Sequence, residues 1–229
     1  MNQLALAIQL NDEASLADFL WDANLLLQKS LMAALENNGE RLFTIWGNIG
    51  CGKSHLLQAY CQAIPNQIPG IYLPLKMLKD LGPQTLENLN EQKLIAIDDI
   101  DAIAQDLDWE LALFHLYNKI KDNGKTILLI STKFPLFALP IKLPDLHSRL
   151  SCGLVTQLHE LSDDLKINVL CQRAAKLGFN LPTKVGQFLL TRCTRNMHNL
   201  NKIINLLDQA SLAAQRKITI PFVKATLQL

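Results

Sequence analysis

The sequence has no long apolar run and no secretory start. No stretch of its 229 residues approaches the roughly 18 consecutive apolar residues that cross a bilayer. The amino terminus, MNQLALAIQLNDE, lacks the basic start and long apolar core of a signal peptide. Internal repeats and low-complexity tracts are also absent. We therefore expect a cytoplasmic globular protein with no membrane contact.

Paired cysteine motifs are missing as well. The five cysteines are odd in number and show no C-x-x-C spacing, so neither a disulfide framework nor a zinc site is indicated. A reducing compartment fits this usage best.

The net charge of +1 is small, but the charge is unevenly distributed. Residues 1–156 carry 12 basic against 17 acidic side chains, and residues 157–229 carry 10 against 4. A basic final third indicates contact with an acidic surface or with DNA. Alternatively, two domains of opposite charge attract each other across a cleft. The length and the hydrophobic fraction of 49% fit one larger domain and one small one.

The segment 41–63, RLFTIWGNIGCGKSHLLQAYCQA, places a glycine turn between an apolar strand and an apolar-faced helix. It matches every fixed position of the phosphate-binding pattern G-x-x-x-x-G-K-[ST]. Backbone N–H groups of such a loop surround phosphates, Lys53 supplies positive charge, and the Ser54 hydroxyl reaches Mg²⁺. A glycine turn can also serve packing alone, but the complete match favours a nucleotide. The loop residues assigned to it are Gly47, Asn48, Gly50, Gly52, Lys53, Ser54 and His55.

A second motif follows the apolar strand KLIAID at 93–98. Its lack of alternation is typical of a strand covered on both faces in a parallel sheet. Asp98 is expected to hold Mg²⁺ as a Walker B residue, and Asp99 to orient or deprotonate a water. Paired acids after a strand can instead cap the next turn, but a complete phosphate loop earlier in the chain favours the functional interpretation.

A third apolar strand, TILLI at 126–130, ends at Ser131 and Thr132. In open α/β sheets, ligands lie outside the carboxyl ends of the strands, so these polar groups should converge on one edge. Helices are expected over residues 15–35 and 109–121, with Gly124 just past the end of the second.

From Ser162 the pattern becomes almost entirely helical. Ser162 is a good N-cap, a second helix is expected from about Pro182, a third over 195–216, and a short one after Pro221. The first ten residues are either an apolar tail that binds a partner protein or a short strand or helix that packs on the core. The sequence thus predicts an α/β parallel-sheet domain followed by a small all-α domain.

The order of these parts resembles that of the AAA+ ATPases. The sequences of five segments indicate a smaller group within the AAA+ ATPases. They are similar to the bacterial replication initiator DnaA and, more closely, to the shorter Hda family of DnaA-related regulators. The segments are GNIGCGKSHLLQA, LIAIDDI, ILLISTKFP, LPDLHSRLSCG and AAQRKITIPFVK. The resemblance covers nearly the whole chain. It implies a clamp-binding tail over 1–12, an AAA+ base domain over 13–156 and a helical lid domain over 157–229.

The tail carries a partner motif by this resemblance. Regulators of the Hda family begin with a peptide that docks on the DNA sliding clamp, and the start of this chain resembles its Q-L-x-L-x-[LI] form. The glutamine amide would fix the register while apolar side chains fill pockets. The residues concerned are Gln3, Leu4, Leu6 and Ile8.

The resemblance also gives roles to residues of the base domain. Arg149, in the short element SRL, stands at the arginine finger, which stabilises charge on the γ-phosphate in a neighbouring protein's site. Ser131 and Thr132 stand at the sensor 1 position. Asn24, in FLWDANLLL, stands near the segment that contacts adenine.

At the sensor 2 position the chain departs from the family. His198 replaces the arginine there, and a histidine is a weaker, pH-dependent phosphate contact. Arg195, one helical turn earlier, is the candidate substitute. This departure puts the chain's own ATP hydrolysis in question.

The sequence suggests three functions to different degrees. The first is a negative regulator of replication initiation that binds ADP or ATP with Mg²⁺ and the clamp, and stimulates hydrolysis of ATP held by the initiator DnaA. The second is a self-contained AAA+ ATPase or helicase loader with its basic lid on DNA. A small-molecule phosphotransferase is disfavoured because no acceptor-site motif is visible. The sequence leaves open the working nucleotide, contact of the lid with DNA and assembly into a homo-oligomer.

Overall fold

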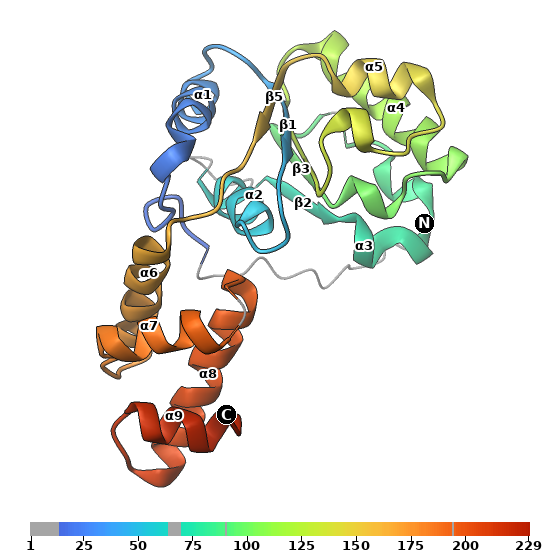
Figure 1. Cartoon of the computed structure of the whole chain (residues 1–229). Helices are drawn as coiled ribbons and strands as arrows, with labels where there is room; N and C mark the ends of the chain where they lie inside the picture. Colours follow the sequence, from blue (N-terminus) through green and yellow to red (C-terminus); the bar gives the residue numbers. More distant parts are fainter. Residues whose placement is uncertain (1–13, 64–69, 90, 194) are drawn as a thin grey trace. The chain divides into compact units, whose positions relative to one another are not determined.

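The computed structural model describes residues 14–63, 70–89, 91–193 and 195–229. The predicted tail over 1–12 lies outside these residues. The chain divides into two compact units (Figure 1). The first contains the described residues up to Asn48 together with Gly52–His159, and the second contains Glu160–Leu229 with Ile49–Cys51. No described helix is long and apolar enough to cross a membrane.

A five-stranded sheet forms the centre of the first unit, in the order β2-β3-β4-β1-β5. Every neighbouring pair of strands is parallel. The strands are β1 (Leu42–Trp46), β2 (Ile71–Pro74), β3 (Leu94–Asp98), β4 (Ile127–Thr132) and β5 (Leu154–Gln157).

The central strands are buried because helices cover both faces of the sheet. All residues of β3 and β4 are buried. Ile95 and Ile97 of β3 share one face and pack with Trp109 and Leu113 in the main apolar cluster. Figure 1 shows α1 and α2 on one side of the strands and α4 and α5 on the other. The helices of this unit are α1 (Leu25–Leu35), α2 (Lys53–Gln62), α3 (Leu75–Leu78), α4 (Leu107–Asn123) and α5 (Pro144–Leu150).

Short 3-10 turns join several of these elements. They are η1 (Asp22–Asn24), η2 (Lys79–Leu81), η3 (Pro83–Leu86), η4 (Ile100–Ala102) and η5 (Leu136–Ala138).

Two features of this unit differ from the sequence prediction. The helix expected over 15–35 begins only at Leu25. Ahead of it, the Phe19 ring lies against Trp21, with ring centroids 4.6 Å apart, instead of continuing a helical face. The edge strand β5 was not predicted, because its residues are only partly buried and carry no apolar pattern.

The second unit is helical, and side-chain caps mark the starts of α6, α8 and α9. The elements are α6 (Asp163–Lys176), α7 (Thr183–Arg192), α8 (Met197–Ala214) and α9 (Ile220–Leu227). Ser162 caps α6 by accepting a hydrogen bond from the Leu165 N–H, as predicted. The third helix starts two residues later than expected, because the Asn196 side chain accepts from the N–H groups of its first turn. One apolar cluster joins all four helices.

A buried carboxylate holds the loop that leads into α5. Glu110, in the first turn of α4, is 1% exposed. Its Oε2 accepts from the Leu143 N–H at 2.8 Å and the Lys142 N–H at 3.0 Å, and its Oε1 accepts from the Gln105 N–H at 2.8 Å. Since buried polar groups are costly unless paired, these bonds fix the start of α5 against α4.

We predict that Glu110→Ala lowers the free energy of unfolding by about 2–4 kcal/mol, because three backbone donors lose a charged acceptor. Urea denaturation measures the loss. Asp108→Ala, an exposed position in the same helical turn, is the matched control and should change stability by less than about 1 kcal/mol. Equal effects of the two substitutions would contradict the role of Glu110.

Candidate nucleotide-binding site

The phosphate loop connects β1 to α2. Gly52, the N-cap of α2, has a φ of 104°, a backbone conformation that side chains other than glycine rarely adopt. Lys53 is 6% exposed. Its Nζ donates to the Gly47 carbonyl at 2.6 Å and to the Asn48 carbonyl at 3.0 Å. The ammonium therefore lies inside the bend of the loop, at the amino end of α2, where an anion is favoured.

Asp98 ends β3 and is 2% exposed. The Ser131 hydroxyl, from β4, donates to its Oδ1. The Tyr72 hydroxyl, from β2, donates to its Oδ2 at 2.6 Å. Ser131 Oγ also accepts from the Asp99 N–H at 3.0 Å. Three neighbouring strands thus hold one carboxylate in a defined orientation.

Asp99 lies just beyond the strand, with a φ of 58°. Burial is the main cause that raises its pKa, followed by the negative charges of Asp98 and Asp101, while Lys133 and Lys53 oppose the rise. Lys133 forms an ion pair of 2.9 Å with Asp101, which keeps its positive charge near Asp99. A carboxylate with a raised pKa beside a buried lysine is typical of a site that handles protons or charged ligands.

Lys53 and the loop fit a phosphate, and the oxygen atoms of Ser54 and Asp98 fit a divalent cation. Among the residues that the structure describes, no cluster of three or more His, Cys, Asp or Glu side chains could hold a metal ion. Mg²⁺ does not need such a cluster, because proteins bind it through one or two carboxylates and the phosphates of its nucleotide. Ser54, exposed at the start of α2, and the oriented Asp98 are the two residues that would hold it.

His55 and Thr132 are two further candidates of the base domain. His55 lies close to the loop and stacks on Phe19, with ring centroids 5.7 Å apart. Thr132, next to Ser131, is fully buried, and its hydroxyl accepts from the Phe134 N–H at 3.2 Å. The Ser131 hydroxyl therefore reaches Asp98, whereas the Thr132 hydroxyl stays with its own turn.

Asn24 has both ends of its amide engaged with the backbone of one residue. Its Nδ2 donates to the His159 carbonyl at 3.1 Å, and its Oδ1 accepts from the His159 N–H at 2.8 Å. The side chain is 5% exposed. It ties the start of α1 to the segment that follows β5.

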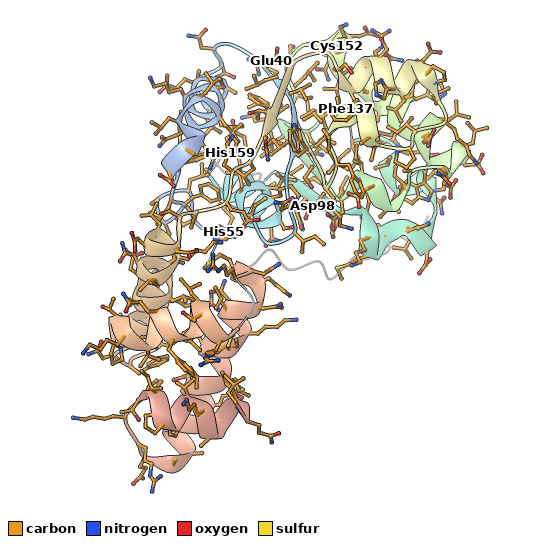
Figure 2. The ribbon with its side chains drawn as sticks, in the orientation of Figure 1. Glu40, His55, Asp98, Phe137, Cys152 and His159 are labelled. Atoms are coloured by element: carbon orange, nitrogen blue, oxygen red, sulfur yellow. The ribbon has the colours of Figure 1, made fainter. Side chains whose placement is uncertain are left out.

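Arg149 lies away from the phosphate loop. It is in the last turn of α5 and is followed by Cys152 and then by β5, whose start pairs with the start of β1. The phosphate loop leaves the opposite end of β1, a strand of five residues, or about 15 Å. Figure 2 shows Cys152 and Glu40 at one end of the strands and Asp98 toward the other. Arg149 is half-buried and forms no salt bridge with any described residue.

The two candidates of the second unit are exposed. Arg195 pairs with Asp163 at 3.4 Å, an exposed ion pair that contributes little to stability. His198 is in the first turn of α8, and its N–H donates to the Asn196 side chain at 2.8 Å.

Two residues with clear structural roles carried no sequence signal. Tyr72 reaches Asp98 because β2 is the neighbour of β3, and strand order cannot be read from a single sequence. Glu110 looks like an ordinary polar residue of an amphipathic helix, although a glutamate in a first turn is a possible acceptor for backbone amides.

Comparison with known proteins gives four relevant likenesses. The family described as "Hda, lid domain" matches residues 163–227. An uncharacterized protein of Haemophilus influenzae is 46% identical over 228 residues, which is 99% of each chain. Domain III of the Thermotoga maritima replication initiation protein DnaA has a TM-score of 0.83 at 21% identity, covering 96% of this chain and 98% of that one.

A fourth likeness is to a structure with a bound nucleotide analogue. AMPPCP-bound DnaA from Aquifex aeolicus has a TM-score of 0.74 at 22% identity, covering 89% of this chain and 68% of that one. The predicted fold class, an AAA+ parallel-sheet domain followed by a helical lid domain, is confirmed.

The raised pKa of Asp99 predicts a pH-dependent cost. Ionising this carboxyl costs more in the folded protein than in the unfolded chain, so the cost is present at pH 7 and disappears as the pH falls through the unfolded value of about 3.9. Asp99→Asn should therefore be more stable than the parent at pH 7, and this gain should shrink toward pH 4. Asparagine also tolerates the positive φ.

Urea denaturation at several pH values measures the difference between the two proteins. Glu91→Gln, an exposed position, is the control and should give a small difference that does not depend on pH. A destabilised Asp99→Asn at pH 7 would contradict the prediction.

Proposed function

This chain belongs to the Hda-like, DnaA-related AAA+ proteins, and on that premise we propose that it is a negative regulator of replication initiation. It binds adenine nucleotide in its own phosphate loop, docks on the DNA sliding clamp through its amino-terminal tail, and inserts Arg149 into the ATP site of the initiator DnaA. Hydrolysis of the initiator's ATP then inactivates the initiator.

Nucleotide binding is supported by the loop and by the likeness to AMPPCP-bound DnaA. Lys53 would neutralise the outer phosphates, and the loop N–H groups and the amino end of α2 would hold the remaining oxygens. The ligand is ADP or ATP. Mg²⁺, held by Ser54 and Asp98, would neutralise charge between the phosphates. The adenine would lie toward Asn24, whose amide orders the segment around it.

One observation carries the proposal of action in trans, namely the position of Arg149 at the amino-terminal edge of the sheet. The chain's own phosphate loop lies at the carboxyl edge, so this guanidinium would act on a site outside its own unit. With no carboxylate engaged among the described residues, it keeps all five N–H donors for a phosphate. Glu110 fixes the loop that precedes α5, the helix that carries Arg149.

The tail motif of Gln3, Leu4, Leu6 and Ile8 lies outside the described residues. Its support is the match to the Q-L-x-L-x-[LI] form and the family to which the chain belongs. A clamp bound to DNA would deliver the regulator to newly replicated DNA and raise its effective concentration near the initiator.

The runner-up function is a self-contained AAA+ ATPase or helicase loader. The oriented Asp98 and the raised pKa of Asp99 favour it, because they are what a hydrolytic site needs. The basic side chains of the second unit suit contact with DNA in either case. His198 at the sensor 2 position and the location of Arg149 favour the regulator.

We predict that Arg149→Ala abolishes stimulation of DnaA ATP hydrolysis while leaving folding, nucleotide binding and clamp binding intact. A finger contributes to the transition state and little to ground-state binding, so the stimulated rate should fall by about 10³-fold. Arg149→Lys should rescue poorly, because an ammonium lacks the planar fork. The measurement is initiator ATPase with DNA-loaded clamp.

Lys142→Ala removes an exposed positive charge from the loop that precedes α5 and is the matched control. It should stimulate the initiator nearly as well as the parent protein. If Arg149→Ala also stimulated normally, and the chain alone turned over ATP in a manner that depends on Asp99, the regulator would be the wrong function and the motor the right one.

For the tail, we predict that replacing Gln3, Leu4 and Leu6 with alanine removes clamp binding without changing the melting temperature or nucleotide affinity. The reason is that the peptide supplies its own register and pocket contacts. A pull-down with purified clamp measures binding, with Asn11→Ala as the control. Full clamp binding by the triple variant would refute the docking role.

A further inference from the structure

Tyr72 is a half-buried residue whose hydroxyl reaches the nucleotide site and has no assigned role. It lies on β2, two residues before the end of that strand, in register with Ala96 of β3. Its ring therefore runs alongside β3, and its Oη reaches Asp98 Oδ2 at 2.6 Å. A phenol that donates to a carboxylate at this distance makes a strong, charge-assisted hydrogen bond.

The same hydroxyl also interacts with the first turns of α2. Gln58 and Ser54 are hydrogen-bonding neighbours of Tyr72, while burial and Asp98 raise its pKa. Tyr72 thus links the two residues between which a divalent cation would lie. Its hydroxyl acts as a donor toward Asp98.

The geometry points to Tyr72 as a positioning residue for Mg²⁺ in the nucleotide site, an inference that rests on the proposed nucleotide binding. Asp98 Oδ2 receives the Tyr72 proton and Oδ1 receives the Ser131 proton. Each carboxylate oxygen keeps a second lone pair, and the two donors fix the direction in which these lone pairs point. The carboxylate can then accept hydrogen bonds from metal-bound water without reorienting.

This role differs from simple packing in what it predicts. Residues that orient a metal-binding carboxylate typically change metal affinity by about 10- to 100-fold when they are replaced. Tyr72→Phe removes one oxygen atom and keeps the ring. It should therefore leave nucleotide affinity in EDTA close to that of the parent, but raise the Mg²⁺ concentration needed for half of the metal-dependent gain in affinity by about tenfold or more.

The chain offers a matched control in Tyr60→Phe. Tyr60 is a fully buried tyrosine of α2, and its hydroxyl donates to the Leu31 carbonyl at 2.7 Å, away from any carboxylate. Both substitutions delete a hydrogen-bonded phenolic hydroxyl, so both should lower thermal stability. Only Tyr72→Phe should raise the Mg²⁺ concentration at which half of the gain in nucleotide affinity is reached. A general loss of stability does not change this concentration.

The experiment is a calorimetric titration of the full chain with ADP and with ATP, in EDTA and over a series of Mg²⁺ concentrations. Nucleotide binding by Tyr72→Phe with an unchanged Mg²⁺ midpoint would overturn the inference and leave the proposed function standing. An equal shift in Tyr60→Phe would overturn it as well. Absence of nucleotide binding by the parent protein in every condition would refute the proposed function itself.

Discussion

The parallel alignment of the five strands is the constraint on which the rest of the molecule depends. In a parallel sheet all carboxyl ends meet at one edge and all amino ends at the other. The phosphate loop and Asp98 therefore share one edge, and the segment that carries Arg149 must lie at the other because it leads into β5. In the proposed function, one edge of the sheet would serve the protein's own ligand and the other a neighbouring protein.

Two buried carboxylates, Asp98 and Glu110, fix the segments around them, and among the described residues neither forms an ion pair. Asp98 accepts from hydroxyl groups of adjacent strands, and Glu110 accepts from backbone amides. Neutral donors satisfy a buried charge without cancelling it. Asp98 therefore retains a field that can act on a metal or water, while Glu110 uses its charge to hold a loop.

The sequence predicted what depends on neighbours along the chain. The phosphate loop, the strand that ends at Asp98 and the helix start at Ser162 are fixed by a local motif, a buried run and a cap. It failed where distant segments decide. The first helix starts at Leu25, just after Asn24, whose amide pairs with a residue 135 positions later. Contacts such as the one between Tyr72 and Asp98 require the strand order, which no local pattern carries.

The loop held by Glu110 is rich in proline, with Pro140 and Pro144 on either side of Lys142 and Leu143. Proline has no N–H to donate, so proline is excluded at both residues that bond to Glu110. At the exposed Lys142, any other side chain is compatible with the bond to Glu110, since only the backbone takes part, whereas Leu143 also packs against the main apolar cluster. The side chain at position 142 can therefore change over evolutionary time while the helix that follows, which carries Arg149, keeps its place.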